Sequence, residues 1–215
     1  MKKIMFNDRY GLTLAVLDGR KTMTRRVEPI CKLVEGWIDL GYTRIDVVKN
    51  GKVRFHDDKT GTYFEEKTIY ALGEIVAVAQ SYKDAGYECI PYRDTDEYLW
   101  LRRDGKVVNG VSITPVCETN KMFTRADLMP HLIQITGIRI ERLQDISDDD
   151  CLREGIEFSH KSQSYYVDSH KEMGCKAWLG RSPREAFAAL IDKVSGRGTW
   201  KSNPYVVVYQ FELVK

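Results

Sequence analysis

The chain has 215 residues, of which 43% are hydrophobic, and its 33 basic residues nearly balance 31 acidic ones. A chain of this length can bury one hydrophobic core, and it lacks an apolar run near the roughly 18 residues of a membrane span or secretory signal. The five cysteines include no Cys-x-x-Cys pair, which argues against zinc-finger and disulfide-exchange proteins. We therefore expect a single cytoplasmic domain, spanning 1–215, without a membrane partner.

The N-terminal segment predicts a strand, a helix and a second strand. Residues 4–6 are apolar, and Asn7 or Asp8 can accept hydrogen bonds from the first turn of a helix. Gly19 is a typical residue after a helix C-terminus. Residues 22–27 mix β-branched and charged side chains, which favours a half-exposed strand closed by the following proline.

The middle of the chain predicts one buried strand between two insertions. Residues 75–79 form a continuous apolar run typical of a buried strand. The insertion at 33–67 carries an Asn-Gly pair between apolar runs, and the insertion at 83–130 carries an Asp-Gly pair at 104–105. Both pairs favour the turn of a β-hairpin.

The C-terminal part predicts two helices and two strands. Residues 131–143 alternate as a strand, Ser147 can cap a short helix before Gly155, and 182–194 have the capping box and apolar stripe of a longer helix. A closing strand follows at 204–214. Many separated strands, with strands first and last, predict an α+β fold: a closed or nearly closed mixed β-barrel decorated by helices.

The segment GRKTMTRR at 19–26 is the strongest candidate for a binding site. Guanidinium groups, a lysine and hydroxyls after a helix end are suited to phosphate binding. A solvated, charged edge strand is the alternative interpretation. The residues we assign to nucleotide binding are Arg20, Thr22, Arg25 and Arg26.

The order of three motifs resembles the ASCH family, a branch of the PUA-like β-barrels associated with RNA. The motifs are LDGRKTMTRR at 17–26, LGEIVAV at 72–78 and ITGIRIERLQDISDDDCLREGI at 135–156. Longer phage and prophage members add a C-terminal signature, which here reads GRGTWKSNPYVVVYQFE at 196–212. The resemblance implies a PUA-like barrel with an RNA-facing cleft, and makes 158–203 a third insertion.

The resemblance also implies a reaction. Some small bacterial members are amidohydrolases that remove the acetyl group of N(4)-acetylcytidine, and their lysine, threonine and glutamate match Lys21, Thr24 and Glu154. Lys21 would be the general base, Thr24 the nucleophile and Glu154 the proton donor. Because side chains three apart point to opposite faces of a strand, Lys21 must precede the strand or a bulge must intervene. Longer relatives continue the second motif as Trp-Val-Arg-Glu, where this chain has uncharged residues at 77–80.

Three further interpretations remain beside this one. A metal site at His160, His170 and Cys175 lacks any established ligand spacing, so we predict neither metal nor cofactor. An aromatic stacking platform for a base is the second interpretation, and its candidates are Tyr165, Tyr166 and Trp178. The third is a non-catalytic phage accessory or assembly protein that uses the barrel to bind another protein.

Overall fold

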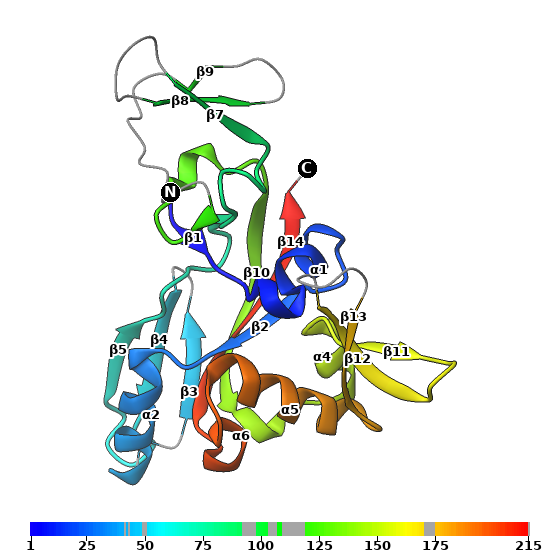
Figure 1. The fold of residues 1–215 in the computed structure, drawn as a ribbon. Coiled ribbons are helices and arrows are strands. Elements are labelled where there is room, and N and C mark those ends of the chain that lie inside the picture. Colours follow the sequence, from blue (N-terminus) through cyan, green and yellow to red (C-terminus); the bar gives the residue numbers. More distant parts are fainter. Residues whose placement is uncertain are drawn as a thin grey trace. The chain divides into compact units, whose positions relative to one another are not determined.

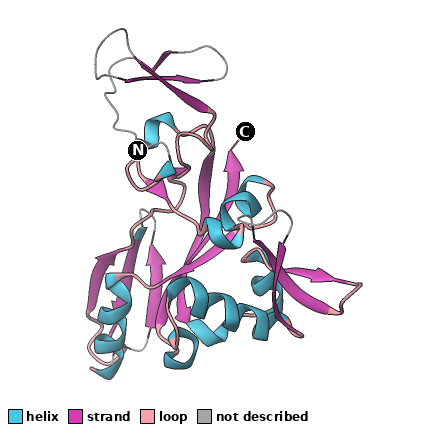
Figure 2. Cartoon of the chain, in the orientation of Figure 1, coloured by secondary structure: helices cyan, strands magenta, loops and turns pink. Residues whose placement is uncertain are grey.

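The computed structural model describes residues 1–40, 42, 44–48, 51–91, 98–102, 107–108, 119–169 and 175–214 (Figures 1 and 2). The chain forms two compact units: residues 1–6, 75–133 and 214–215 make the first, and residues 7–74 and 134–213 make the second. In the described part of the chain, none of the helices has the length and apolar character needed to cross a membrane.

In its described residues, the first unit holds short strands and a 3-10 turn. Its elements are β1 (Lys3–Ile4), β6 (Ile75–Val78), β7 (Tyr87–Pro91), β8 (Tyr98–Arg102), β9 (Val107–Val108), η3 (Ala126–Leu128) and the start of β10 (Leu132–Arg142). Strands β1 and β6 are parallel, and β7, β8 and β9 form an antiparallel sheet. The pairing of β8 with β9 confirms the second predicted hairpin, although its turn at 104–105 lies outside the described residues.

The second unit holds the longer elements. They are η1 (Asp8–Tyr10), α1 (Leu12–Leu17), β2 (Met23–Arg26), α2 (Pro29–Asp39), β3 (Arg44–Val48), β4 (Lys52–His56), β5 (Tyr63–Lys67), the rest of β10, η4 (Leu143–Asp145), α4 (Asp148–Arg153), β11 (Glu157–Ser159), β12 (Ser164–Ser169), β13 (Cys175–Gly180), α5 (Pro183–Ser195), α6 (Thr199–Ser202) and β14 (Tyr205–Val214). Strands β10, β14 and β2 lie in that order in one sheet, and β3–β5 and β11–β13 form two three-stranded sheets.

The predicted α+β fold is confirmed. Strand β2 falls within the predicted strand at 22–27, and the antiparallel pairing of β3 with β4 confirms the first hairpin. Ser147 and Ser182 accept hydrogen bonds at the starts of α4 and α5, as predicted. None of the sheets in the described ranges closes into a barrel, so the barrel is not confirmed.

Helix α2 corrects the prediction that Pro29 ends the N-terminal segment and that only short strands follow. Pro29 instead occupies the first turn of the helix, where its missing N–H removes no hydrogen bond. The backbone N–H of Cys31 donates to the carbonyl of Glu28, which begins the helix. Ile30 and Val34 are buried on one side of α2 and stabilise it through packing.

Candidate functional site

Lys21 lies in the turn that joins α1 to β2. Its backbone N–H donates to the carbonyl of Ala15 at 2.8 Å, which closes the end of the helix, and Gly19 provides the left-handed turn with a φ of 74°. The N–H of Thr22 then donates to the carbonyl of Arg153 at 3.0 Å. Lys21 therefore precedes the strand, which is one of the two arrangements that the sequence allowed.

Glu154 lies at the opposite side of the same site, directly after α4. Its N–H donates to the carbonyl of Asp150 at 3.0 Å, so its position is set by the last turn of the helix. Gly155 follows with a φ of 97°, and a Cβ there would lie 3.3 Å from the Cβ of Lys21. A glycine at 155 thus allows the chain to turn while α4 approaches Lys21 closely.

Lys21 and Glu154 form a buried ion pair. The Lys21 Nζ lies 2.5 Å from Glu154 Oε2 and 2.8 Å from the Glu154 backbone oxygen. The two residues are 2% and 4% exposed. Burial lowers the pKa of Lys21; Glu154 opposes this shift, and Arg26 and Arg25 add to it.

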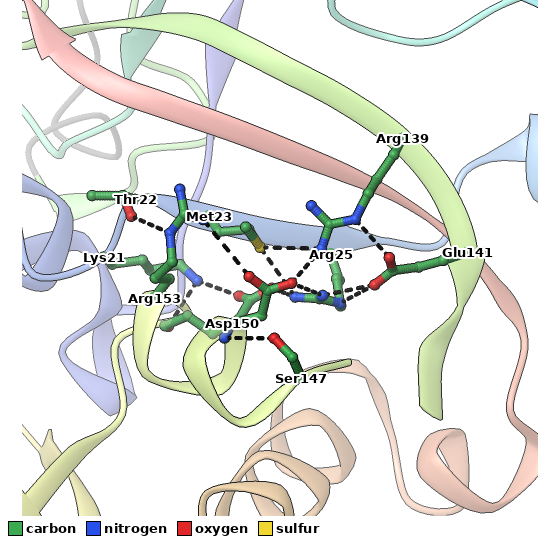
Figure 3. A network of polar contacts seen from close by, with 10 residues as sticks. Lys21, Thr22, Met23, Arg25, Arg139, Glu141, Ser147, Asp150 and Arg153 are labelled. Atoms are coloured by element: carbon green, nitrogen blue, oxygen red, sulfur yellow. Dashed lines mark hydrogen bonds and ion pairs between the residues drawn. The ribbon is translucent and has the colours of Figure 1, made fainter. Parts of the chain in front are cut away.

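Arg25 connects this ion pair to two further carboxylates (Figure 3). Its side chain is 0% exposed, and its Nη1 lies 3.2 Å from Glu154 Oε1, so Lys21 and Arg25 hold different oxygens of one carboxylate. Its Nη2 lies 2.7 Å from Glu141 Oε1 and 2.9 Å from Asp150 Oδ2. Figure 3 shows Glu141 and Asp150 converging on the Arg25 guanidinium.

Three carboxylates of this network face three cations, and Arg153 adds a fourth cation 3.7 Å from Asp150 Oδ1. Arg139 also binds Glu141, at 2.6 Å, and Asp150. We call these six residues the Arg25 network: Lys21, Arg25, Arg139, Glu141, Asp150 and Glu154. Buried charges are tolerated when they are paired and hydrogen-bonded, so loss of one member leaves an uncompensated charge.

Thr24 lies in β2 between Met23 and Arg25, so strand alternation places its side chain on the face opposite the Arg25 network. Its cross-strand partner is Tyr209. Among the described residues, the Thr24 hydroxyl makes no hydrogen bond, although Thr24 is buried. The structure therefore brings Lys21 and Glu154 together and leaves Thr24 on the other face.

The Thr24 face holds a buried polar group that the sequence did not predict. The Tyr209 hydroxyl donates to Glu28 Oε1 at 2.8 Å, and the Ile69 N–H donates to Glu28 Oε2 at 3.0 Å. Burial, reinforced by the Glu28 carboxylate, raises the pKa of Tyr209. Glu28 and Tyr209 are separated by 181 residues, and neither belongs to a motif that would have linked them.

Two of the four residues predicted to bind nucleotide contact protein carboxylates. Arg20 binds Asp18 at 2.9 Å and also contacts Glu157, and Arg25 is fully enclosed. The Thr22 hydroxyl accepts a hydrogen bond from Arg153 Nε at 3.3 Å. Arg20 and Arg26 keep part of their surface accessible, so of the four residues these two retain exposed cationic surface.

The other predicted sites are placed only in part. Within the described ranges, no group of three His, Cys, Asp or Glu side chains could hold a metal ion, and His170 lies outside those ranges. Ala79 is fully buried, and the Gln80 side chain contacts the His131 ring at 2.7 Å, at the positions where the resemblance implies a charged pair. Trp178 is 51% exposed, in contrast to its neighbour Tyr166 at 8%.

Comparison with known proteins adds no assignment. No family model, curated protein or solved structure matches the chain.

Proposed function

We propose that the chain is an ASCH-type, PUA-like domain that binds RNA or a modified nucleotide and hydrolyses the amide of N(4)-acetylcytidine. The observation that supports this proposal is the contact between Lys21 and Glu154, which are 133 residues apart in sequence. The resemblance names these two residues as base and acid, and they share a buried site in which the pKa of Lys21 is lowered.

The chemistry requires one proton acceptor and one proton donor near the amide. A lowered pKa increases the fraction of neutral Lys21, whose amine can take a proton from the attacking hydroxyl. Glu154, 2.5 Å away, can pass this proton to the exocyclic nitrogen as the carbon–nitrogen bond breaks. Water supplies the oxygen that becomes bonded to the acetyl carbon. The products are therefore cytidine and acetate.

Two nucleophiles are compatible with this scheme. The resemblance assigns the attack to Thr24, which would form an acetyl ester that water then cleaves. Thr24 lies on the other face of β2, so a water molecule activated by Lys21 is the second nucleophile. A Thr24→Val variant separates them, because it removes the hydroxyl and leaves Lys21 and Glu154 in place.

Access to the pair is part of the proposal. Lys21 is only 2% exposed, so substrate can reach its amine only when the turn around Gly155 or the end of α4 opens locally. A purely structural role for the Arg25 network is the competing explanation. It predicts no hydrolysis by the intact protein and a loss of stability when Lys21 is replaced.

The test is to incubate the protein with N(4)-acetylcytidine and to follow cytidine by chromatography. We expect Lys21→Met to reduce the rate by roughly 10²- to 10⁴-fold, the usual effect of losing a general base. Lys52→Met is the matched control, because Lys52 is a half-exposed lysine paired with Glu65 at 2.6 Å. Full activity in Lys21→Met, or none in the intact protein, would contradict the proposed reaction.

A further inference from the structure

The β11–β13 sheet presents one face that contains aromatic and charged side chains (yellow strands in Figure 1). Tyr166 pairs with both Glu157 and Trp178, and Asp168 pairs with Lys176. Directly paired residues, and residues two apart, point to the same side of a sheet. We call this set the Trp178 face: Glu157, Tyr166, Asp168, Lys176 and Trp178.

Trp178 packs against the ring of Tyr166, and about half of its own side chain is exposed. The rings of Trp178 and Tyr166 are 5.5 Å apart at an interplanar angle of 58°. The Tyr166 hydroxyl donates to Glu157 Oε2 at 3.2 Å, which holds Tyr166 in place. Tyr166 is thus nearly covered, while Trp178 is 51% exposed.

At β12 and β13, the other side of the same sheet packs against α5, while Phe158 in β11 stays exposed on that side. Val167, between Tyr166 and Asp168, is 1% exposed, and α5 packs against β12 and β13. The burial of Val167 is consistent with a sheet that has one face on the protein interior and one face toward solvent. The exposure of Trp178 therefore belongs to the outer face.

Among the described charged residues of the Trp178 face, Lys176 is a cation that forms no ion pair. Arg20 contacts Glu157 and lies 3.8 Å from Asp168, so both acids of the face have a cationic partner. Lys176 is exposed, and its Nζ lies 3.9 Å from the centre of the Tyr166 ring. Across the described residues, Lys176 forms no ion pair, so it can attract an anionic group while staying next to the aromatic rings.

We propose that the Trp178 face binds single-stranded RNA, with an unpaired base stacked on Trp178 and a phosphate near Lys176. An exposed ring beside a free cation is the combination that binds single strands with little sequence preference. The inference rests on the proposed function and narrows its substrate. Arg20 contacts Glu157 of this face and directly precedes Lys21 in the chain, so a strand lying on the face also approaches the turn that holds Lys21. The preferred substrate is then an acetylated cytidine within an RNA strand, and the free nucleoside is a poorer substrate of the same reaction.

The first test measures binding of a fluorescent, unmodified single-stranded RNA octamer to the full chain by anisotropy. Trp178→Ala should weaken binding by roughly 5- to 150-fold, the range found when one stacking side chain is removed. Trp178→Phe should retain most of the affinity, because phenylalanine keeps an aromatic face. Lys176→Gln should reduce the slope of log affinity against log salt by about one unit.

The matched control is Phe158→Ala. Phe158 is an exposed aromatic residue of the same sheet, and it pairs with Tyr165 on the side opposite Trp178. Phe158→Ala should bind the octamer as the unmodified chain does. Equal loss in both alanine variants, unchanged binding by Trp178→Ala, or no octamer binding at all would overturn the Trp178 face as an RNA site.

A second measurement separates this inference from the proposed reaction. If both are correct, the intact chain hydrolyses an acetylated oligonucleotide faster than free N(4)-acetylcytidine, and Trp178→Ala removes that difference. If the reaction is wrong and the face is right, no variant hydrolyses either substrate, and Trp178→Ala still loses octamer binding. If the Trp178 face does not bind RNA, Trp178→Ala and the unmodified chain remove the acetyl group from the acetylated oligonucleotide at the same rate.

Discussion

The Arg25 network and the Trp178 face use cations in opposite ways. In the network, the Arg25 side chain is fully enclosed and contacts three carboxylates. On the Trp178 face, Lys176 is exposed and lies over an aromatic ring. A dense run of basic residues therefore does not mark the most accessible cation. Lys21 and Arg25 of the segment at 19–26 are buried, whereas Lys176 in β13 is exposed.

The largest expected difference between the two regions is in stability. Arg25→Met should lower the free energy of unfolding by about 3–5 kcal/mol, because it leaves buried carboxylates without their cation. Chemical denaturation measures this change. Arg44→Met is the matched control, since Arg44 forms an exposed pair with Asp46 at 3.2 Å and should cost about 0–1 kcal/mol. Equal effects of the two substitutions would show that the Arg25 network is not a buried charge cluster.

The next effect concerns the approach of α4 to Lys21. Gly155→Ala should cost about 1–3 kcal/mol, because alanine is strained at a φ of 97° and its Cβ would contact Lys21. Gly61→Ala carries similar backbone strain at a φ of 69° but meets no atom within 4 Å. Thermal unfolding of both variants should show the larger loss at 155. A larger loss at 61 would mean that Lys21 and α4 are not in close contact.

Lys21 should make stability depend on pH. Its pKa is lowered in the folded chain, so between that lowered pKa and the unfolded value of about 10.4 the unfolded chain binds more protons. The unfolding free energy should therefore rise with pH across this window, by up to about 1.4 kcal/mol per pH unit. The rise should be absent in Lys21→Met. A rise that persists in that variant would have to come from another group.

The smallest expected effect is on the Trp178 face. Trp178→Ala should lower the unfolding free energy by about 0.5–1.5 kcal/mol, because it removes the ring contact with Tyr166 while half of the side chain is already in solvent. Thermal unfolding checks this alongside the binding assay. A loss above about 2 kcal/mol would show that Trp178 is a packing residue and would remove the contrast with the Arg25 network.

The sequence predicted those helices and strands whose signals, such as helix caps, lie within a few residues of one another. Ser182, Pro183 and Glu185 predicted the start of α5 because capping acts over one turn. Helix α2 was missed because Pro29 was interpreted as an end, although proline is equally common in the first turn of a helix.

The candidate site was predictable only in part, because its contacts join distant segments. Lys21 and Glu154 were linked through the resemblance and not through any spacing. The partners of Arg25 lie 116 to 129 residues away, so its enclosure could not be inferred from its basic neighbours. Tyr209 lies in the C-terminal signature at 196–212, but Glu28 lies outside every quoted motif, so their pairing became visible only in the folded chain.

The most direct measurement of the central claim is the titration of Lys21 itself. Nuclear magnetic resonance of the chain with isotope-labelled lysine, assigned by comparison with Lys21→Met, follows the ionisation of its amine. The account predicts that the Lys21 pKa lies below the ordinary value of about 10.4, and that Glu154→Gln lowers it further by removing the carboxylate that favours the charged form. A Lys21 pKa at or above the ordinary value, unchanged in Glu154→Gln, would contradict a proton-transfer pair at this site.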